Sequence, residues 1–213
     1  MSTITTACRL PQDQNMEFTL MRHGESDHNV TYVPNEQGEL VKGFYNSDPR
    51  HPGYTPSHLT EKGKEQARHT AIRLLSEGME PGSIRRVIIS ELPRTLETAM
   101  LVKEAGLFAD DVEIITDPRL NELQVGDAEG KAVLPSWYDV TKREDAEKLS
   151  EVDERVSAFV RDHLPGGMRG VLVVTHGVVA TALKKYFGIP TATRLETGEA
   201  ISVRLLQEAV ASR

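Results

Sequence analysis

Two histidines in this 213-residue chain each stand directly before a glycine at the end of an apolar run. In FTLMRHGESDHN the run ends in Arg22, His23 and Gly24, and after GVLVVT come His176 and Gly177. Guanidinium groups bind phosphate oxygens through two hydrogen bonds at once, and imidazole can act as a nucleophile. These residue types therefore predict a phosphate site at which a histidine could take up a phosphoryl group.

The glycines after these histidines add to that prediction. Each histidine–glycine pair precedes a predicted helix, and small residues there let a ligand approach backbone N–H groups, so we expect Gly24 and Gly177 to contact phosphate. A third apolar run, RVIIS, is followed by Arg94 within ELPR. Since ligands bind at the carboxyl ends of parallel strands, Arg94 is expected to join the same site.

Strands and helices must alternate to bring these residues together. Continuous runs of Val, Ile and Leu favour strands buried on both faces of a sheet, and apolar residues at helical spacing lie between them. The predicted strands are 18–21, 86–90, 112–116, 170–175 and 200–206, and the predicted helices are 61–78, 93–106, 146–164 and 177–188. The alternation predicts an α/β fold with three layers, α/β/α, around a mostly parallel central sheet.

The domain organisation is expected to be simple. Residues 1–16 are polar and aperiodic, so we predict a flexible N-terminal tail. Residues 17–213 show no linker or internal repeat and are predicted to form one domain. An extended loop at about 30–57, rich in Pro, Gly and Tyr, is too long for a simple connection.

Composition excludes several classes of partner. The net charge of −7 and pI near 5.5 argue against nucleic acid, which needs a basic surface. No segment reaches the length of an apolar membrane span, so we expect no membrane partner. The single cysteine, Cys8, cannot form an internal disulfide, which together with the missing signal peptide predicts a cytoplasmic protein. The sequence leaves open whether the chain forms a homo-oligomer.

Five motifs in order resemble the histidine phosphatase superfamily, also called the phosphoglycerate mutase-like family. They are LMRHGESDHN, HLTEKGKEQA, SELPRTLETA, DPRLNELQVGDAEG and VLVVTHG, and they span most of residues 17–206. The hallmark of that family is an Arg-His-Gly motif whose histidine becomes phosphorylated. The resemblance implies the phosphoglycerate mutase-like fold and phosphoryl-transfer chemistry.

The resemblance also implies roles for individual residues. His23 resembles the nucleophile, which takes the phosphoryl group on one ring nitrogen while the backbone holds the other. Arg22, Arg94 and His176 resemble the cationic pocket that grips the phosphate and stabilises its charge during transfer, and Asn29 matches a further donor. Attack requires a neutral imidazole, and we expect the two arginines to lower the pKa of His23 towards that form.

Three further residues are assigned through the same resemblance. Glu122, within LNEL, resembles the acid that protonates the leaving oxygen and then deprotonates the attacking water. A dianionic phosphate beside it would raise its pKa and favour the protonated acid. Ser26 shares the motif of His23 and is expected at the phosphate. Lys42 lies in VKGFYNSD, which faintly resembles the substrate loop of the family, and is a candidate phosphate contact.

The region around that last motif has two interpretations. Lys42, Tyr45 or Arg50 could contact the leaving group of the substrate. Alternatively, the whole segment 30–57 is a surface loop that packs only on itself. The sequence does not decide between them.

The implied reaction is the hydrolysis of a small phosphate ester through phosphohistidine, with neither metal nor cofactor. The five other histidines lack ligand-like spacing, and we expect most to be solvated; they are His28, His51, His58, His69 and His163. A phosphoglycerate mutase-type isomerase and a non-catalytic binding protein on the same fold are the alternatives. Hydrolysis is favoured because few basic residues between Glu122 and His176 could hold a second phosphate or carboxylate.

Overall fold

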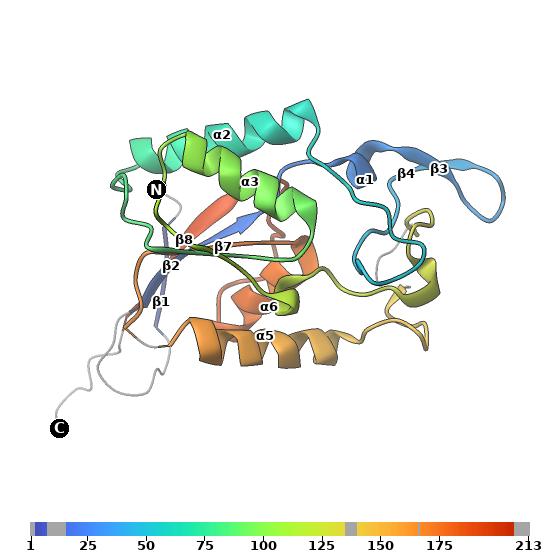
Figure 1. Cartoon of the computed structure of the whole chain (residues 1–213). Coiled ribbons are helices and arrows are strands. Elements are labelled where there is room, and N and C mark those ends of the chain that lie inside the picture. Colours follow the sequence, from blue (N-terminus) through green and yellow to red (C-terminus); the bar gives the residue numbers. More distant parts are fainter. Residues whose placement is uncertain (1–2, 8–15, 135–139, 166, 207–213) are drawn as a thin grey trace, which may run out of the picture.

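The computed structural model describes residues 3–7, 16–134, 140–165 and 167–206. A six-stranded sheet with the order β1-β8-β2-β7-β5-β6 forms its centre (Figure 1). Its strands are β1 (Thr3–Ala7), β2 (Met16–Arg22), β5 (Arg86–Ile89), β6 (Ile114–Thr116), β7 (Val171–Thr175) and β8 (Ala200–Leu206). All five predicted strands are present.

The sheet is parallel where the site residues lie and mixed at one edge. Strands β2, β7, β5 and β6 pair in parallel, whereas β8 runs antiparallel to β2. Every side chain of β7 is buried, as its continuous Val and Leu composition predicts. The carboxyl ends of β2, β5, β6 and β7 therefore meet along one edge, and the mostly parallel sheet is confirmed.

Helices cover both faces of the sheet, which confirms the three-layer α/β/α prediction. Figure 1 shows α2 (Glu61–Ser76) and α3 (Pro93–Glu104) on one face, and α5 (Leu149–His163) and α6 (Gly177–Tyr186) on the other. In α5 the buried Val152, Val156 and Phe159 recur at helical spacing and form the face that packs inward. Two apolar cores result, one between each helical layer and the sheet.

The prediction of a flexible tail over 1–16 is wrong for Thr3–Ala7 and for Met16. The sequence TITTA forms β1, which pairs in parallel with β8, and the buried Met16 begins β2. Threonine and isoleucine favour strands, and the outer edge of β8 offers unpaired backbone groups. Residues 8–15, with Cys8, lie outside the described residues.

The segment 30–57 contains more regular structure than predicted. After the short helix α1 (Asp27–Val30), the strands β3 (Tyr32–Pro34) and β4 (Leu40–Lys42) form a hairpin that extends away from the sheet (Figure 1). Its turn is stabilised by the Asn35 side chain, which accepts hydrogen bonds from the backbone of Gln37 and Glu39. Residues 43–57, called the docked segment below, then return to the body of the molecule.

No helix among the described residues is both long and apolar enough to cross a bilayer. The two short 3₁₀ turns η1 (Pro118–Leu120) and η2 (Gly126–Ala128) complete the described elements and flank the loop that carries Glu122.

Candidate active site

His23 directly follows β2 and is held by backbone groups through its main-chain N–H and through one ring nitrogen. Its N–H donates to the Thr175 carbonyl at 3.0 Å, and Nδ1 lies 2.7 Å from the Gly24 carbonyl oxygen. Since a carbonyl can only accept, Nδ1 carries the proton and Nε2 keeps a free electron pair. The residue is only 2% exposed. The arrangement presents Nε2 as the reactive atom, as the nucleophile prediction requires.

The charge state of His23 fits the same role. Burial lowers the pKa of His23 well below its ordinary value, and the positive charges of Arg94 and Arg22 lower it further. The imidazole is therefore neutral at pH 7. The expected direction is confirmed, with burial as the larger cause.

Arg94 enters the site from the first turn of α3 and is fully buried. Its Nε donates to Nε2 of His23 at 3.3 Å, while its terminal nitrogens donate to the side-chain and backbone oxygens of Asn46 at 2.6 and 2.7 Å. Burial lowers the pKa of Arg94 to about 10, so the group stays charged at neutral pH. Its partners are all neutral, which leaves a buried positive charge available to an anion.

Arg22 and His176 join His23 and Arg94 in one cluster, called the cradle below. Arg22 donates to the Leu195 carbonyl at 2.9 Å, and burial lowers its pKa. The rings of His176 and His23 lie 5.0 Å apart, and Nε2 of His176 contacts the Ser90 hydroxyl at 2.8 Å. Burial lowers the pKa of His176 well below its ordinary value. The strand ends thus bring the four predicted residues, His23, Arg94, Arg22 and His176, together.

The helix α1 supplies a polar group of three residues beside the cradle. The Asn29 side chain accepts from the backbone N–H of Ser26 at 3.0 Å and donates to Nε2 of His28 at 2.9 Å. Nδ1 of His28 contacts the hydroxyls of Ser26 and Ser57 at 2.8 and 3.2 Å. Ser26 and Asn29 therefore direct polar atoms at His28, and their contact with phosphate stays a prediction.

The expectation that most of the five other histidines are solvated does not hold for His28. Its ring lies 5.8 Å from that of His23, and burial followed by Arg94 lowers its pKa well below the ordinary value. The single turn of α1 places His28 over the site. Residue spacing alone does not reveal this position. Of the other four, His58 and His69 are exposed, whereas His51 and His163 are partly buried beside Asp127 and Asp117.

Glu122 lies at the N-terminus of α6. Its carboxylate accepts hydrogen bonds from the backbone of Leu123 at 3.0 Å and of Val178 at 3.2 and 3.3 Å. Its charge raises the pKa values of Arg22 and Arg94, which places it within electrostatic reach of both. The predicted acid is therefore held at the rim of the cradle.

The two glycines have packing roles that the prediction did not include. A Cβ on Gly24 would collide with the Gly63 carbonyl of α2, and the Gly24 N–H donates to the Thr98 hydroxyl at 3.1 Å. A Cβ on Gly177 would collide with the guanidinium of Arg194. The contact of Gly24 and Gly177 with phosphate stays a prediction, and the Gly24 N–H is engaged by Thr98 in this structure.

Arg194 is a candidate residue that sequence reasoning missed. Its side chain is 42% exposed and lies over the start of α6, 3.9 Å from the Glu122 carboxylate. It belongs to the loop before β8, where nothing in the sequence marks it. Only the return of this loop to the carboxyl ends of the strands brings Arg194 to the site.

Lys42 does not join the buried cluster. It is exposed on β4, and its charge has only a minor lowering effect on the pKa of Glu25. Arg50 is also directed elsewhere, since it pairs with Glu91 at 2.9 Å. The suggested phosphate contact of Lys42 is therefore not supported, because its side chain is exposed at the end of β4.

The docked segment packs on the site instead of only on itself. Asn46, 4% exposed, holds Arg94 as described above, and both carboxylate oxygens of the buried Glu129 accept from Ser47, at 2.8 and 2.7 Å. The backbone of Tyr45 donates to Lys131 at 2.9 Å. The interpretation of the region 30–57 as a self-contained loop is wrong for these residues, and Asn46 is a further site residue that the sequence did not indicate.

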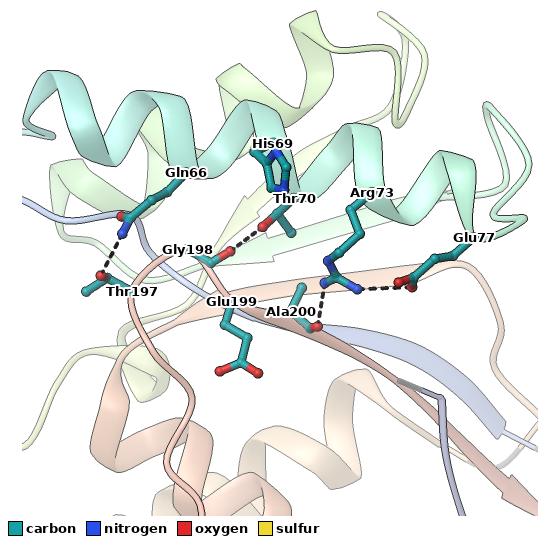
Figure 2. A pocket seen from close by; sticks show the side chains of 9 residues that line it. All are labelled: Gln66, His69, Thr70, Arg73, Glu77, Thr197, Gly198, Glu199 and Ala200. Carbon is teal, nitrogen blue, oxygen red and sulfur yellow. Dashed lines mark hydrogen bonds and ion pairs between the residues drawn. The ribbon is translucent and has the colours of Figure 1, made fainter. Parts of the chain in front are cut away.

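A separate pocket of about 350 Å³ lies between α2 and the residues that lead into β8 (Figure 2). Across it, Gln66, Thr70 and Arg73 donate to Thr197, Gly198 and Ala200. No residue of the cradle lines this pocket. Residues 197–200, which line this pocket, do support the cradle. The Gly198 N–H donates to the His23 carbonyl at 2.8 Å, and the Glu199 carbonyl accepts from the Arg22 N–H at 3.0 Å.

The described residues contain no group of three or more His, Cys, Asp or Glu side chains arranged to hold a metal ion. The chemistry that the cluster offers is instead a neutral imidazole beside the buried guanidinium of Arg94, the half-buried guanidinium of Arg22 and a carboxylate. Such a set can bind a dianionic phosphate, attack it and move a proton.

Comparisons with known proteins agree with this chemistry. A family model described as Histidine phosphatase superfamily (branch 1) matches residues 18–199. The chain is similar to the probable phosphoglycerate mutase GpmB of Enterobacter sp. (strain 638), with 30% identity over 82% of this chain and 76% of the relative. The corresponding protein of Photorhabdus laumondii is 33% identical over 71% of this chain and 53% of the relative.

Two solved structures show the same fold at lower identity. The alpha-ribazole phosphatase from Shigella flexneri has a TM-score of 0.60 and 22% identity, covering 90% of this chain and 95% of that one. A mycobacterial glucosyl-3-phosphoglycerate phosphatase has a TM-score of 0.60 and 20% identity, covering 89% and 90% of the two chains. These likenesses support the layered α/β architecture.

Proposed function

Since this chain belongs to the Histidine phosphatase superfamily (branch 1), we propose that it is a metal-independent phosphomonoester hydrolase acting through phosphohistidine on a small phosphorylated metabolite. The observation that carries the proposal is the unprotonated Nε2 of a buried His23 that faces Arg94, a guanidinium without a carboxylate partner in the described residues. A neutral nucleophile and an uncompensated positive charge are what a phosphate dianion requires.

In the first proposed step, Nε2 of His23 attacks phosphorus. The N–P bond forms as the ester P–O bond breaks, and Glu122 gives its proton to the leaving oxygen. Arg22, Arg94 and His176 stabilise the charge on the phosphoryl oxygens during transfer. The alcohol leaves with the proton.

In the second step, the carboxylate of Glu122 takes a proton from water, and the resulting hydroxide attacks phosphorus. The N–P bond breaks, inorganic phosphate is released, and the imidazole of His23 regains its electron pair. Each residue returns to its starting protonation state, so no net proton stays on the protein.

A mutase is the second candidate, because the curated relatives named above are called probable phosphoglycerate mutases. Retaining a phosphoryl group for return to a sugar acid requires basic residues for the second anionic group. Two of the basic residues between Glu122 and His176 are already paired, Arg143 with Asp145 and Arg155 with Glu147. The names of the two phosphatase structures also favour hydrolysis.

The proposed partner is a small phosphate ester rather than nucleic acid or a membrane, in line with the net charge of −7. A cytoplasmic location follows as part of the same proposal, because small phosphorylated metabolites are mostly found there. The exposed rim at Arg194 is the side from which such a substrate would enter.

The test is hydrolysis of p-nitrophenyl phosphate in excess EDTA, with wild type beside His23→Ala. We expect turnover to persist with the chelator and to fall by about 10⁴-fold or more in the variant. A panel of natural phosphate esters would then identify the substrate class. Phosphoryl exchange between positions of a sugar acid, dependent on a bisphosphate primer and without net phosphate release, would favour the mutase. Binding without either reaction would favour the non-catalytic protein.

A further inference from the structure

Within the described residues, three buried side-chain polar atoms have no hydrogen-bond partner: Nε of Arg22, Nδ1 of His176 and the hydroxyl of Tyr54. Such atoms are rare in folded proteins, and each calls for an explanation. The first two belong to the cradle proposed above for the phosphate, where an oxygen of the ligand would be their partner. The third belongs to the docked segment and has been given no role so far.

Tyr54 sits in a part of the docked segment that is held against the site from both sides. Its N–H donates to the His51 carbonyl at 3.0 Å, and the backbone around Gly53 lies so close to Gly130 that a Cβ on the latter would be 2.5 Å from the Gly53 carbonyl oxygen. The Thr55 carbonyl accepts from the Asn46 side chain at 2.6 Å. Because Asn46 also binds Arg94, the chain on the far side of Tyr54 is tied directly to the cradle.

The surroundings of the hydroxyl are charged. Tyr54 and Arg94 each shift the pKa of the other, which places the hydroxyl within electrostatic reach of the cradle guanidinium. Glu129 is the carboxylate within the same reach, but it accepts from Ser47 and makes no hydrogen bond with the Tyr54 hydroxyl. Burial raises the pKa of Tyr54, so the hydroxyl keeps its proton and remains a donor.

Several N–H groups of Arg94 are already hydrogen-bonded, so a phosphate held beside it would gain from a further donor. Both terminal nitrogens of Arg94 donate to Asn46, and its Nε points to His23. A phosphoryl group on Nε2 of His23 would therefore find the charge of Arg94 close by, but two of the five N–H groups of Arg94 are engaged by Asn46. A nearby neutral donor would supply what the guanidinium has given to Asn46.

We propose that Tyr54 is a further phosphate-binding residue, whose hydroxyl donates a hydrogen bond to a non-bridging oxygen of the phosphoryl group held beside Arg94. The inference rests on the proposed function for the identity of the ligand. It assigns the docked segment a direct contact with the substrate, in addition to its hold on Arg94.

Binding of inorganic phosphate by titration calorimetry tests this assignment without turnover. Tyr54→Phe keeps the ring and removes only the hydroxyl, and we expect it to weaken phosphate binding by about tenfold or more, the usual cost of a lost hydrogen bond to a charged group. Tyr32→Phe is the matched control, since its side chain is 61% exposed in the same region of the chain. It should bind phosphate as the wild type does.

Thermal unfolding without phosphate separates a ligand contact from a structural one. The Tyr54 hydroxyl makes no hydrogen bond within the free protein, so its removal should not lower the stability of the fold. Tyr54→Phe should therefore melt at or above the temperature of the wild type. Equal phosphate affinity in Tyr54→Phe and wild type would overturn the assignment, and so would a lower melting temperature of Tyr54→Phe.

Failure of the proposed function would look different. If wild type binds phosphate and Tyr54→Phe does not, while neither hydrolyses any ester, the binding assignment holds and the hydrolase proposal fails. If wild type itself does not bind phosphate, both the cradle and the role of Tyr54 are overturned together.

Discussion

The two walls of the site are built in different ways. The sheet edge places His23 and His176 directly after β2 and β7, and Arg94 in the first turn of α3, the helix that follows β5. Their positions therefore follow from strand order. The docked segment places Asn46 and Tyr54 through contacts with distant parts of the chain, namely Arg94 and the backbone of Glu129–Gly130. The sheet edge carries the reactive groups, whereas the docked segment holds and surrounds them.

Because of this difference, the residues that react and the residues that select the ligand lie on different parts of the fold. Reactive groups on strand ends sit on the most rigid part of the fold, where small displacements are least frequent. A connecting segment tolerates sequence change more readily, and it can alter contacts to the ligand without moving the nucleophile. Changes at the sheet edge should therefore remove steps of the reaction, and changes in the docked segment should weaken binding.

Glu122→Gln should give the larger effect, on the sheet-edge side. The amide oxygen can still accept from Leu123 and Val178, so the fold is retained while the proton donor is lost. We expect kcat/KM for an alkyl phosphate such as glycerol phosphate to fall by about 10²- to 10⁴-fold, and that for p-nitrophenyl phosphate by about tenfold or less, because an activated leaving group needs little protonation. Steady-state kinetics on both esters measures the ratio.

The control for that experiment is Glu113→Gln, which changes an exposed glutamate before β6. It should leave both rates unchanged. Equal losses on the two esters in Glu122→Gln would contradict the role of this carboxyl as the acid.

The ease of predicting the two walls from sequence differs for the same physical reason. Strand ends are local features, so an apolar run followed by Arg-His-Gly or His-Gly already locates His23 and His176. Asn46, Tyr54 and Arg194 carry ordinary polar side chains in irregular segments, and only tertiary contacts bring them to the site. The same holds for His28, whose direction depends on one turn of a four-residue helix.

The edge strand β1 shows a related limit. TITTA has strand-forming composition, but five residues without apolar alternation do not predict a strand. Pairing with the edge of β8 determines this conformation. Glu122 lies between these cases, since its motif pointed to the acid while its hydrogen bonds to α6 could not be read from the sequence.

Asn46→Asp should produce an intermediate effect, on the docked-segment side. The two side chains have the same shape, but a carboxylate would pair with Arg94, cancel its charge and repel a phosphate dianion. We expect inorganic phosphate to bind about tenfold more weakly or worse, as measured by calorimetry. Gln37→Glu adds the same charge on the exposed hairpin and should not matter; unchanged affinity in Asn46→Asp would mean that Arg94 does not hold the ligand.

Acid should lower the free energy of unfolding through the histidines of the sheet edge and their neighbour His28. The pKa values of His23, His28 and His176 are all lowered from 6.5 in the folded protein. Below pH 6.5 the unfolded chain therefore binds more protons than the folded one, and stability falls as pH falls, by up to about 1.4 kcal/mol per pH unit for each histidine. Above pH 7 these groups contribute no pH dependence.

Urea unfolding between pH 7.5 and 5.5 measures this slope. His28→Asn removes one of the three groups and should make the slope shallower over the same window. A slope that is unchanged in this variant would show that His28 titrates normally in the folded state. Replacement of the exposed His69 by Asn is the control and should leave the slope as it is.

Lys42→Met should give the smallest effect, and it tests where the docked segment begins. Lys42 ends β4 on the hairpin, one residue before the docked segment, and its side chain is exposed. An exposed charge that is screened by water contributes little, so kcat/KM and phosphate affinity should both stay within about twofold of wild type. A tenfold loss would mean that the hairpin closes over the bound substrate and carries Lys42 to the phosphate. In that case the boundary between the part that holds the ligand and the part that extends away from it would lie before β3 and not at Gly43.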